Sequence, residues 1–300
     1  MILIPRSKVV YSFSPRHKPA AFAKSGDIVI FETIDALGGQ VRSEDVSINE
    51  IDWSRVNPAT GPLYVEGAEP GDTLVIDIID IEVEKESVII AVPGYGALHD
   101  KLSKPKVKML KLINDKLSFN SLLIDVRPMI GVIGVAPESG EYPTGTLGEY
   151  GGNMNVALIT KGARLYLPVF VKGALLAIGD LHVVQGDGEI CVSAAEVSGR
   201  VTVKVNIIKG RRPRYPVLET NNRFAVLTYG KTVDEAVYKA SEAAVEILMK
   251  ACNLSFEEAY MLASLIVDLR INQVVDPMKG VRAEIPKKYV NIDDVLLKQA

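Results

Sequence analysis

The chain has 300 residues, 48% hydrophobic and 24% charged, and its 34 Lys and Arg against 37 Asp and Glu leave a formal net charge of −3. This composition indicates a globular protein with a large core, and without a basic block it argues against nucleic acid as a partner. No apolar run reaches the ~18 residues that span a bilayer, and the run at residues 1–6 is too short for a signal peptide. We therefore expect a cytoplasmic protein with no membrane partner. Two cysteines, Cys191 and Cys252, suggest no disulfide framework.

The first predicted strand ends at an acidic residue. Residues 27–34 are rich in β-branched side chains, and Asp35 follows them directly. The next residues, Leu37 to Gln40, contain the pair Gly38 and Gly39, which predicts a loop with unusual backbone torsions. An aspartate in this position is well placed for a metal or active site. Without further information, an Asx hydrogen bond that closes the turn is the more common role.

Short strands at a steady spacing predict a sandwich or jelly roll. Residues 73–83 and 88–92 are rich in β-branched side chains. Turn residues come just before the first range and just after the second. Residues 101–127 are rich in lysine and contain two short apolar runs, at 107–112 and 122–126. We expect this part to form a peripheral ribbon.

The middle of the chain holds two candidate site segments. Residues 130–135 predict a buried strand, and the long polar loop that follows contains Glu138. A carboxylate just past a buried strand suits a general base, although a solvated loop glutamate fits equally well. Further on, Gly152 and Asn153 lie in the run Gly-Gly-Asn-Met, whose backbone N–H groups could face an oxyanion.

The segment 179–196 carries the densest chemistry, with four carboxylates and one histidine. On a strand, Asp180 and His182 project from the same face about 7 Å apart, which suits two ligands of one metal ion. The turn residues 185–188 would return Glu189 to the same end of the sheet. Oxygen ligands with one imidazole fit a divalent metal ion, zinc first and calcium or manganese as alternatives. The competing interpretation is a hairpin with a polar turn in water and a histidine bound to a nearby carboxylate.

The character of the chain changes after residue 211. Thr232 and Ser255 each stand three residues before a glutamate and predict helix starts, with the helices reaching about Lys250 and about Leu269. The sequence thus predicts an α+β fold. A β-rich, sandwich or jelly-roll-like metal-site domain would span residues 1–210, and an α+β region with two helices packed on the sheet would span residues 211–300.

Several motifs, in order along most of the chain, resemble those of the acetamidase/formamidase family. The matching segments are Phe31 to Gln40, Asn57 to Val65, Pro128 to Glu138, Gly151 to Met154, Leu165 to Phe170, the Gly-Asp-x-His-x-x-x-Gly-Asp-Gly-Glu run from Gly179 to Glu189, and Arg270 to Pro277. The resemblance implies an amidase that hydrolyses short linear amides such as formamide and acetamide to a carboxylate and ammonia. It also leads us to expect a homo-oligomer, with a dimer favoured.

Within that family mechanism, we assign roles to particular side chains. The expected metal ligands are Asp35, Asp180 and His182, the proton acceptors Glu138 or Glu189, and the oxyanion donors Gly152 and Asn153. The metal would polarise the amide carbonyl and lower the pKa of a bound water.

Two positions depart from the family pattern. Family members commonly have His-Gly-Gly-Asn-Met-Asp where this chain has Tyr150 to Asn155, so that a histidine is lost and a neutral amide replaces a carboxylate. An uncharged oxygen is a weaker ligand for a dication. The alternative hypothesis is therefore a non-catalytic β-sandwich protein that binds a metal or another ligand.

Overall fold

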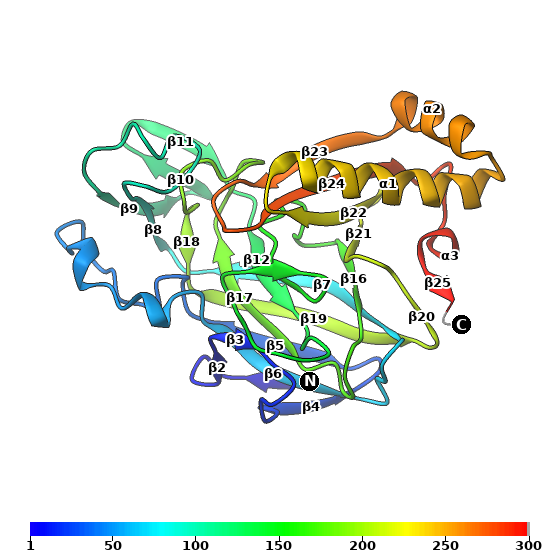
Figure 1. Ribbon diagram of the computed structural model, residues 1–300. Coiled ribbons are helices and arrows are strands. Elements are labelled where there is room, and N and C mark those ends of the chain that lie inside the picture. The colour runs from blue at the N-terminus through cyan, green and yellow to red at the C-terminus, as the bar shows by residue number, and fades with distance from the viewer. Residues whose placement is uncertain (299–300) are drawn as a thin grey trace.

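The computed structural model describes residues 1–298 and consists of two large β-sheets with helices on one side (Figure 1). The α-helices in this part are α1 (Val233–Cys252), α2 (Phe256–Ile266) and α3 (Ile292–Val295). Two short 3-10 helices, η1 (Ile48–Glu50) and η2 (Trp53–Arg55), lie in the loop after the first long strand. No helix among these residues has the length and apolar character needed to cross a membrane.

The first sheet has nine strands and includes strands from both ends of the chain. Its order is β1 (Ile2–Ile4), β5 (Ile28–Thr33), β19 (Gly199–Ile208), β7 (Thr73–Val83), β16 (Arg164–Pro168), β21 (Val217–Glu219), β22 (Arg223–Gly230), β24 (Lys279–Pro286) and β23 (Asp268–Gln273). Neighbours are antiparallel except β1 and β5.

The second sheet has twelve strands and carries the candidate site. Its main path is β11 (Leu122–Asp125), β10 (Lys116–Phe119), β9 (Lys106–Ile113), β8 (Glu86–Ala91), β18 (Glu196–Val197), β17 (Leu176–His182), β12 (Met129–Gly134), β15 (Gly151–Asn153) and β14 (Leu147–Gly148). β6 (Ala59–Glu66) pairs with β17, β2 (Val9–Val10) and β4 (Ala21–Lys24). Two small pairs complete the structure, β3 (Ser12–Phe13) with β13 (Tyr142–Pro143) and β20 (Arg211–Arg212) with β25 (Leu297–Lys298).

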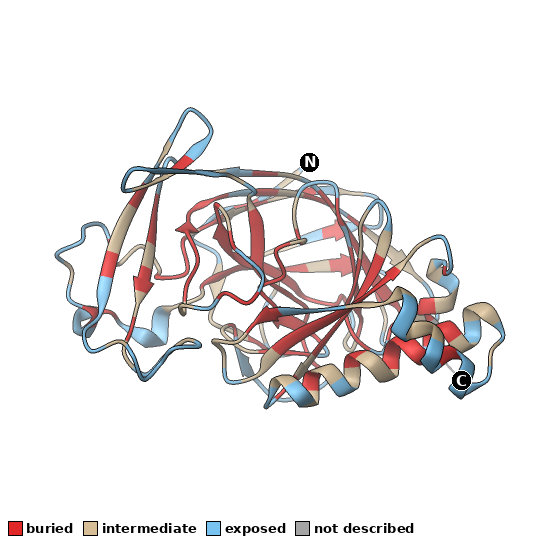
Figure 2. Ribbon diagram, turned by 90° about the horizontal axis from the view of Figure 1, so that it is seen from above, coloured by how far each residue is buried: buried red, intermediate tan, exposed pale blue. Residues whose placement is uncertain are grey.

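The main hydrophobic core lies between the two sheets. Phe31 and Ile76 from the nine-stranded sheet belong to the same buried cluster as Ile133 and Ile178 from the other sheet. Alternate residues of the nine-stranded sheet face the opposite way, towards α1, because side chains on a strand alternate between the two faces. Figure 2 shows the buried residues concentrated in the strands and along one face of the long helix.

The two predicted helices are present, and their starts agree with the predicted caps. Thr232 accepts the N–H of Glu235, and Ser255 and Glu258 form a capping box. α1 ends at Cys252 and α2 at Ile266, three residues before the predicted end. α2 ends earlier because the next residues form β23, whose backbone pairs with β24.

The helices pack on the sheet unequally. α1 buries an alanine-rich face against β22 and β24, whereas α2 buries only Ala259. Phe256, Tyr260, Met261 and Leu265 of α2 are exposed. The expected homo-oligomer stays a prediction.

The predicted fold class is confirmed, since two sheets form a β-rich core and the C-terminal helices pack on a sheet. The predicted ribbon at 101–127 corresponds to β9, β10 and β11, which extend the twelve-stranded sheet outward from β8. The division at residue 210 stays a prediction, and β16 and β21, from either side of it, are hydrogen-bonded neighbours.

Candidate metal and active site

The candidate site is built at the end of β17, where the strand turns into a long loop and returns as β18. β17 and β18 are antiparallel, and His182 lies directly opposite Glu196 in the pairing. Asp180, two residues earlier, has a left-handed backbone with φ 54°. This register brings three side chains of one short stretch together, because residues opposite each other in an antiparallel pair are close neighbours.

Asp180, His182 and Glu196 form a buried cluster whose ligand atoms all lie within 4.8 Å of one another. His182 Nε2 is 3.1 Å from Asp180 Oδ1 and 3.1 Å from Glu196 Oε2. The three side chains are 0 to 4% exposed. Carboxylate oxygens and an imidazole nitrogen are donor types that zinc and other divalent metal ions accept in proteins.

Two further carboxyl groups face the same cavity, which has a volume of about 160 Å³. Glu189 is buried, and its backbone is left-handed with φ 42°. Asp276, in the loop after β23, is partly exposed as a residue, but its Oδ2 is buried. Four carboxyl groups therefore line this cavity, and the imidazole of His182 contacts two of them. If all four were ionised, the cavity would hold an excess of negative charge. Buried charge of one sign is costly unless a counterion neutralises it.

The pKa values at the site respond to this crowding. Burial raises the pKa of Glu189 and of Asp276 well above the usual range, and nearby acidic groups raise them further. Burial also raises the pKa of Glu196, to about 7, although the charge of His182 opposes this. For His182, burial lowers the pKa, but the charges of Glu196 and Asp180 outweigh it and hold the pKa well above the usual value. The cluster thus favours a positive charge at Nε2, from a proton or from a metal ion.

Gln185 determines which nitrogen of His182 faces the carboxylates. Its Oε1 is 2.9 Å from His182 Nδ1, while its Nε2 donates to the carbonyl of Asn155 at 2.8 Å. Only the NH₂ end of the amide can donate to a carbonyl, so Oε1 must accept a hydrogen bond from Nδ1. The neutral imidazole then carries its lone pair on Nε2, directed at the two carboxylates. This is the arrangement that orients a histidine for metal binding.

Unpaired polar atoms supply a second test of whether a metal fits. Five atoms of the cavity lining are buried without a hydrogen-bond partner, namely Asn153 Oδ1, Asn155 Oδ1, Glu189 Oε2, Glu196 Oε2 and Asp276 Oδ2. All five are oxygen acceptors, and buried acceptors are rarely left without a partner. A divalent cation or a substrate N–H would satisfy such oxygens, so the residues present fit a metal site.

Gly131 allows the side chains of Asp180 and Asn155 to approach each other closely, because it has no side chain of its own. A Cβ on Gly131 of β12 would lie 2.3 Å from Asp180 Oδ2 and 2.4 Å from Asn155 Oδ1. The backbone N–H groups of Met154 and Asn155 both donate to the carbonyl of Gly131, which holds the Asn155 segment against this strand. Asn155 Oδ1 and Asp180 Oδ2 are therefore neighbours at the site.

Asp35, an expected metal ligand, is buried but lies outside the cluster of Asp180, His182 and Glu196. Its Oδ1 accepts the N–H groups of Leu37 and Gly39, both at 3.1 Å, and its Oδ2 is 3.3 Å from Arg42. The carboxylate thus closes its own loop, as in the alternative Asx interpretation. The loop still contributes to the site, because Leu37 lines the cavity.

The structure separates the two candidate proton acceptors. Glu189 lines the cavity beside the cluster, whereas Glu138 is exposed and lines a different hollow of about 450 Å³ with Tyr142 and Phe170. Only Glu189 shares the cavity with Asp180.

The expected oxyanion donors have a different arrangement from the one predicted. The backbone N–H of Asn153 donates to the carbonyl of Thr146 at 2.9 Å, and Gly152 pairs with β12 and β14 inside the sheet. The Asn153 side chain, in contrast, lines the cavity. A side-chain amide is therefore the group of this segment that can contact a substrate.

The two departures from the family motif also occupy different places. Asn155 lines the cavity, but Tyr150 lines the hollow that contains Glu138 and packs against Phe13 and Tyr142. Burial raises the pKa of the Tyr150 hydroxyl to about 12, and this hydroxyl lies 2.9 Å from Thr146 Oγ1.

Sequence reasoning assigned no role to Glu196, Asp276 and Gln185. Glu196 stands 14 residues after His182 in the sequence, and only the pairing of β17 with β18 brings the two together. Asp276 arrives from the far end of the chain. A usable signal was the set of polar residues Asp268, Arg270, Asn272 and Gln273, which lie among apolar residues in a segment that ends just before Asp276.

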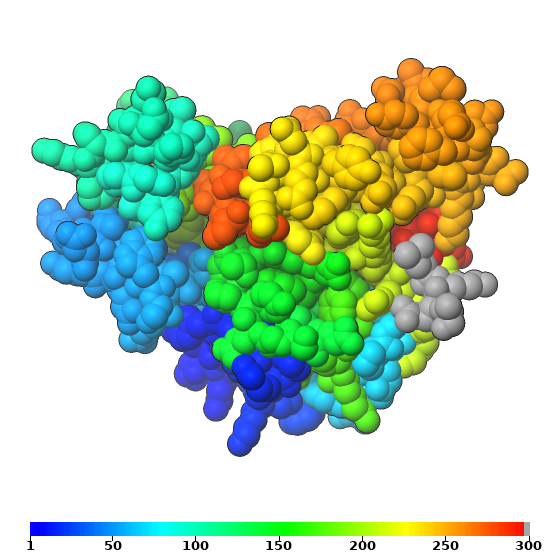
Figure 3. Space-filling view, viewed as in Figure 1, coloured from blue at the N-terminus to red at the C-terminus, as the bar shows by residue number. Residues whose placement is uncertain are grey.

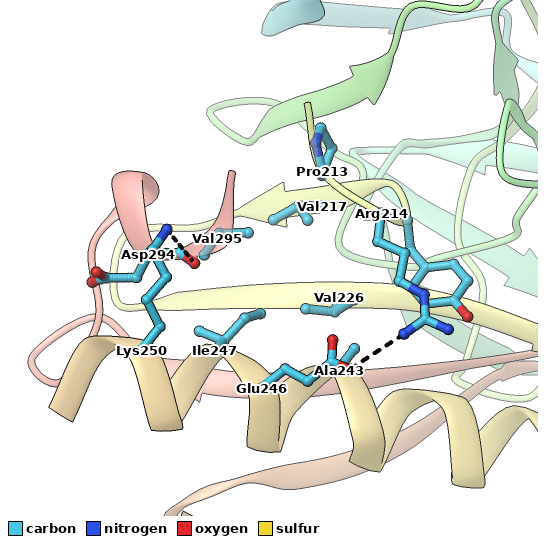
Figure 4. A pocket seen from close by; sticks show the side chains of 11 residues that line it. Pro213, Arg214, Val217, Val226, Ala243, Glu246, Ile247, Lys250, Asp294 and Val295 are labelled. Atoms are coloured by element: carbon cyan, nitrogen blue, oxygen red, sulfur yellow. Dashed lines mark hydrogen bonds and ion pairs between the residues drawn. The ribbon is translucent and has the colours of Figure 1, made fainter. Parts of the chain in front are cut away.

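A smaller hollow between α1, β22 and α3 lacks the features of a site (Figure 4). Its volume is about 50 Å³, and its charged groups are paired. Arg214 contacts Glu242 and Glu246, and Lys250 donates to backbone carbonyls of the α3 segment. These contacts stabilise the packing of the helix, and none of the described residues that line the hollow has a buried side-chain oxygen without a partner.

Comparison with known proteins identifies the family of the chain. The model of the acetamidase/formamidase family matches residues 7–146 and 143–290. The chain belongs to the acetamidase/formamidase family. The family predicted from the sequence motifs is thus confirmed, and with it the expectation of an enzyme of the amidase class.

The similarity extends over the whole fold. A crystal structure of an acetamidase from Bacillus halodurans superposes with a TM-score of 0.94 at 41% identity, covering 98% of this chain and 99% of that one. A formamidase of Methylophilus methylotrophus is 28% identical in an alignment of length 286 that covers 72% of this chain and 70% of that protein. An acetamidase of Mycolicibacterium smegmatis is 28% identical in an alignment of length 266 that covers 66% of this chain and 65% of that protein. The chain spans about two thirds of the length of these two relatives.

Proposed function

We propose that this member of the acetamidase/formamidase family is a metal-dependent amidase, which hydrolyses short linear amides to a carboxylate and ammonia. The observation that carries the proposal is the cavity with four carboxyl groups, one oriented imidazole and unpaired buried oxygens. Family membership supplies the reaction class, and formamidases and acetamidases are among the relatives.

In this proposal Asp180, His182 and Glu196 hold the metal, and zinc fits them best. Zinc accepts one imidazole with two carboxylates, whereas calcium prefers six to eight oxygen ligands. A bound divalent ion polarises an amide carbonyl and makes water more acidic. Gln185 keeps Nε2 of His182 directed at the ion through its hydrogen bond to Nδ1.

Glu189 is the proposed proton carrier. Its Oε2 faces the cavity without a partner, and burial raises the pKa of its carboxyl group, which makes the carboxylate a stronger base. Water adds to the carbonyl carbon and gives a proton to Glu189. The proton then passes to the amide nitrogen as the C–N bond breaks, which releases ammonia and leaves the carboxylic acid, which then ionises to the carboxylate. The Asn153 side chain orients the amide group.

Two isosteric substitutions test these separate roles. Glu196→Gln should weaken metal binding by at least tenfold, because a charged ligand becomes neutral. Glu189→Gln should keep its metal but lower the rate of ammonia release by ~10²- to 10⁴-fold, the usual contribution of a general base. Metal content is measured by elemental analysis, and activity by ammonia release from formamide and acetamide with zinc, manganese or calcium.

Glu138→Gln is the matched control, since this exposed glutamate lies in another hollow. It should change neither metal content nor activity. Full metal occupancy in Glu196→Gln would contradict the ligand assignment. A wild-type protein that holds metal but releases no ammonia from any amide would support the non-catalytic alternative, which the neutral Asn155 favours.

A further inference from the structure

The loop that carries Glu189 is tied to a strand near the far end of the chain by an ion pair. Both carboxylate oxygens of Asp187 accept hydrogen bonds from the guanidinium of Arg282, a residue of β24, at 2.6 Å and 3.0 Å. Arg282 is 2% exposed, and the side chain of Asp187 is 36% exposed. Two parallel bonds of this kind fix the angle between the two groups as well as their distance. The pair therefore fixes the position of the chain two residues before Glu189.

Arg282 is itself held by two more groups. Its Nε donates to Glu284 Oε1 at 2.7 Å, and its Nη1 donates to Asn272 Oδ1 at 2.9 Å as well as to Asp187. Burial lowers the pKa of the Arg282 guanidinium, but the hydrogen bonds and charges of Asp187 and Glu284 outweigh burial and raise it. The guanidinium thus stays charged in a fixed orientation, and it can hold the loop at one point.

The backbone of the same loop pairs with the end of β23. The N–H of Gly188 donates to the carbonyl of Asn272 at 3.0 Å, and the N–H of Val274 donates to the carbonyl of Gly188 at 3.1 Å. Figures 1 and 3 show the end of β23 and the loop after it, in orange, between the ribbon β9–β11 and α1. Asn272 contacts the loop through its backbone and Arg282 through its side chain. The ion pair and these backbone bonds therefore form one connected set of contacts.

Two groups of the proposed active site depend on this loop. Gln185 orients His182 through the hydrogen bond to Nδ1, and Glu189 directs its Oε2 into the cavity. Only residues 186–188 separate Gln185 from Glu189, and Asp187 is the middle one. Glu189 has a left-handed backbone with φ 42°, a conformation that persists only where the surrounding structure holds it. The position of Asp187 therefore affects both groups.

Stability alone is a weak reason for such an ion pair. Burial of a charged guanidinium is costly, and well-packed apolar side chains often stabilise a protein as much as a buried ion pair does. A bidentate pair supplies a defined geometry, which apolar packing does not specify so narrowly. This geometry is present at the point of the loop that lies between the two site groups.

We propose that Asp187 and Arg282 are positioning residues of the active site, whose ion pair holds Gln185 and Glu189 in the arrangement that metal binding and proton transfer need. The proposal rests on the proposed amidase function and adds two residues that preorganise the same site. Each acts through the loop rather than by contact with the substrate. Loss of the pair should therefore lower the rate of the reaction more than it weakens substrate binding, because Glu189 acts in the transition state.

The first test compares two variants that each remove the charge of one paired carboxylate. Asp187→Asn weakens the pair with Arg282, and Asp72→Asn weakens the pair of Asp72 with Lys209, which lies outside the cavity lining. With saturating zinc, Asp187→Asn should lower kcat for ammonia release from formamide ~10- to 100-fold and leave KM nearly unchanged. Asp72→Asn should lower the stability in a urea titration without lowering kcat. A purely structural role of Asp187 would leave kcat unchanged in both variants.

A double-mutant cycle tests whether the two residues act as a pair. Arg282→Lys keeps the positive charge but loses the planar fork that binds both oxygens of Asp187. It should also lower kcat, and the double variant Asp187→Asn with Arg282→Lys should be no slower than the slower single variant. Fully additive losses would show that the two residues act separately and would overturn the pair.

Two further measurements need no turnover. Hydrogen exchange across residues 184–190 should be faster in Asp187→Asn than in the wild type, because the loop opens more often. The affinity for zinc, measured in competition with a chelator, should fall at least tenfold in Asp187→Asn, because Gln185 no longer orients His182. Asp72→Asn should change neither quantity.

These measurements separate the positioning role from the amidase function. Suppose that the wild type releases no ammonia, whereas Asp187→Asn loses zinc affinity and protection from exchange in the loop. This result would reject the amidase function and support the positioning of the metal site. Wild-type ammonia release together with unchanged kcat and zinc affinity in Asp187→Asn would uphold the amidase function and reject the positioning role.

Discussion

A left-handed backbone occurs at several residues that line the site cavity, among them Asn155 with φ 48°, Asp180 with φ 54° and Glu189 with φ 42°. Such conformations are uncommon for residues other than glycine, and they concentrate at functional sites where the surrounding structure holds them. These three backbone torsions direct the carboxylate and amide groups into the cavity. A regular strand or loop backbone would direct the side chains elsewhere at these positions.

Asn155→Asp tests whether a neutral amide limits metal binding. The new carboxylate would lie beside Asp180 Oδ2, because both groups pack against Gly131. Aspartate tolerates a left-handed backbone about as well as asparagine, so the change adds little strain. Affinity for a divalent ion should rise at least tenfold by calorimetric titration of chelator-treated protein. Tyr150→His should leave the affinity unchanged, since Tyr150 lies in another hollow, and an equal gain from it would contradict this geometry.

At the scale of elements, the two main helices contribute unequally to stability. α1 packs its buried face on β22 and β24, while α2 buries only Ala259. Both start with a side-chain cap, Thr232 in α1 and Ser255 in α2. Loss of the α1 cap should therefore destabilise the whole protein. Loss of the α2 cap should chiefly destabilise α2 itself.

Thr232→Ala should lower the free energy of unfolding by ~1 kcal/mol in a urea titration. Ser255→Ala should mainly accelerate hydrogen exchange across residues 256–266, with a smaller effect on global unfolding. Thr232→Ser and Ser255→Thr are the controls, because they keep a hydroxyl at the cap. Metal content should be unaffected in all four variants. If both alanine variants match the wild type in both measurements, the caps do not stabilise these helices.

At the scale of the whole molecule, a buried carboxylate joins distant parts of the nine-stranded sheet. Asp72, just before β7, contacts Lys209 at 2.5 Å and accepts the N–H groups of Gly210 and Glu69. Burial alone would raise the pKa of Asp72, but these hydrogen bonds together outweigh it and lower the pKa. The charged carboxylate therefore stabilises the native state.

A lowered pKa in the folded state sets the direction of the pH effect. The contribution of Asp72 is complete above its unfolded pKa of ~3.9 and is lost as the pH falls through the lower folded value. Asp72→Asn should be less stable than the wild type by ~1–3 kcal/mol at pH 7, and this difference should shrink at acidic pH in urea titrations. Asp100→Asn, an exposed control beside Lys101, should show no such trend. A difference that is the same at pH 7 and pH 3 would contradict the assignment.

The sequence by itself determined the features that depend on neighbours along the chain. β-branched runs predicted several long strands, among them β5, β7 and β12, and Thr232 and Ser255 predicted the helix starts, because a cap acts within one turn. The ordered motifs predicted the family, and the spacing of Asp180 and His182 indicated that the two side chains would meet.

Only the tertiary structure decided which other groups complete the site. Glu196 reaches His182 through the pairing of β17 with β18, and Asp276 reaches the cavity from the end of β23. Asp35, in contrast, has its oxygens occupied by its own loop and Arg42, and Glu138 faces a different hollow. Each of these outcomes depends on strand register and loop packing between residues far apart in sequence. No local pattern encodes that register, because it minimises the free energy of the whole core rather than of any one segment.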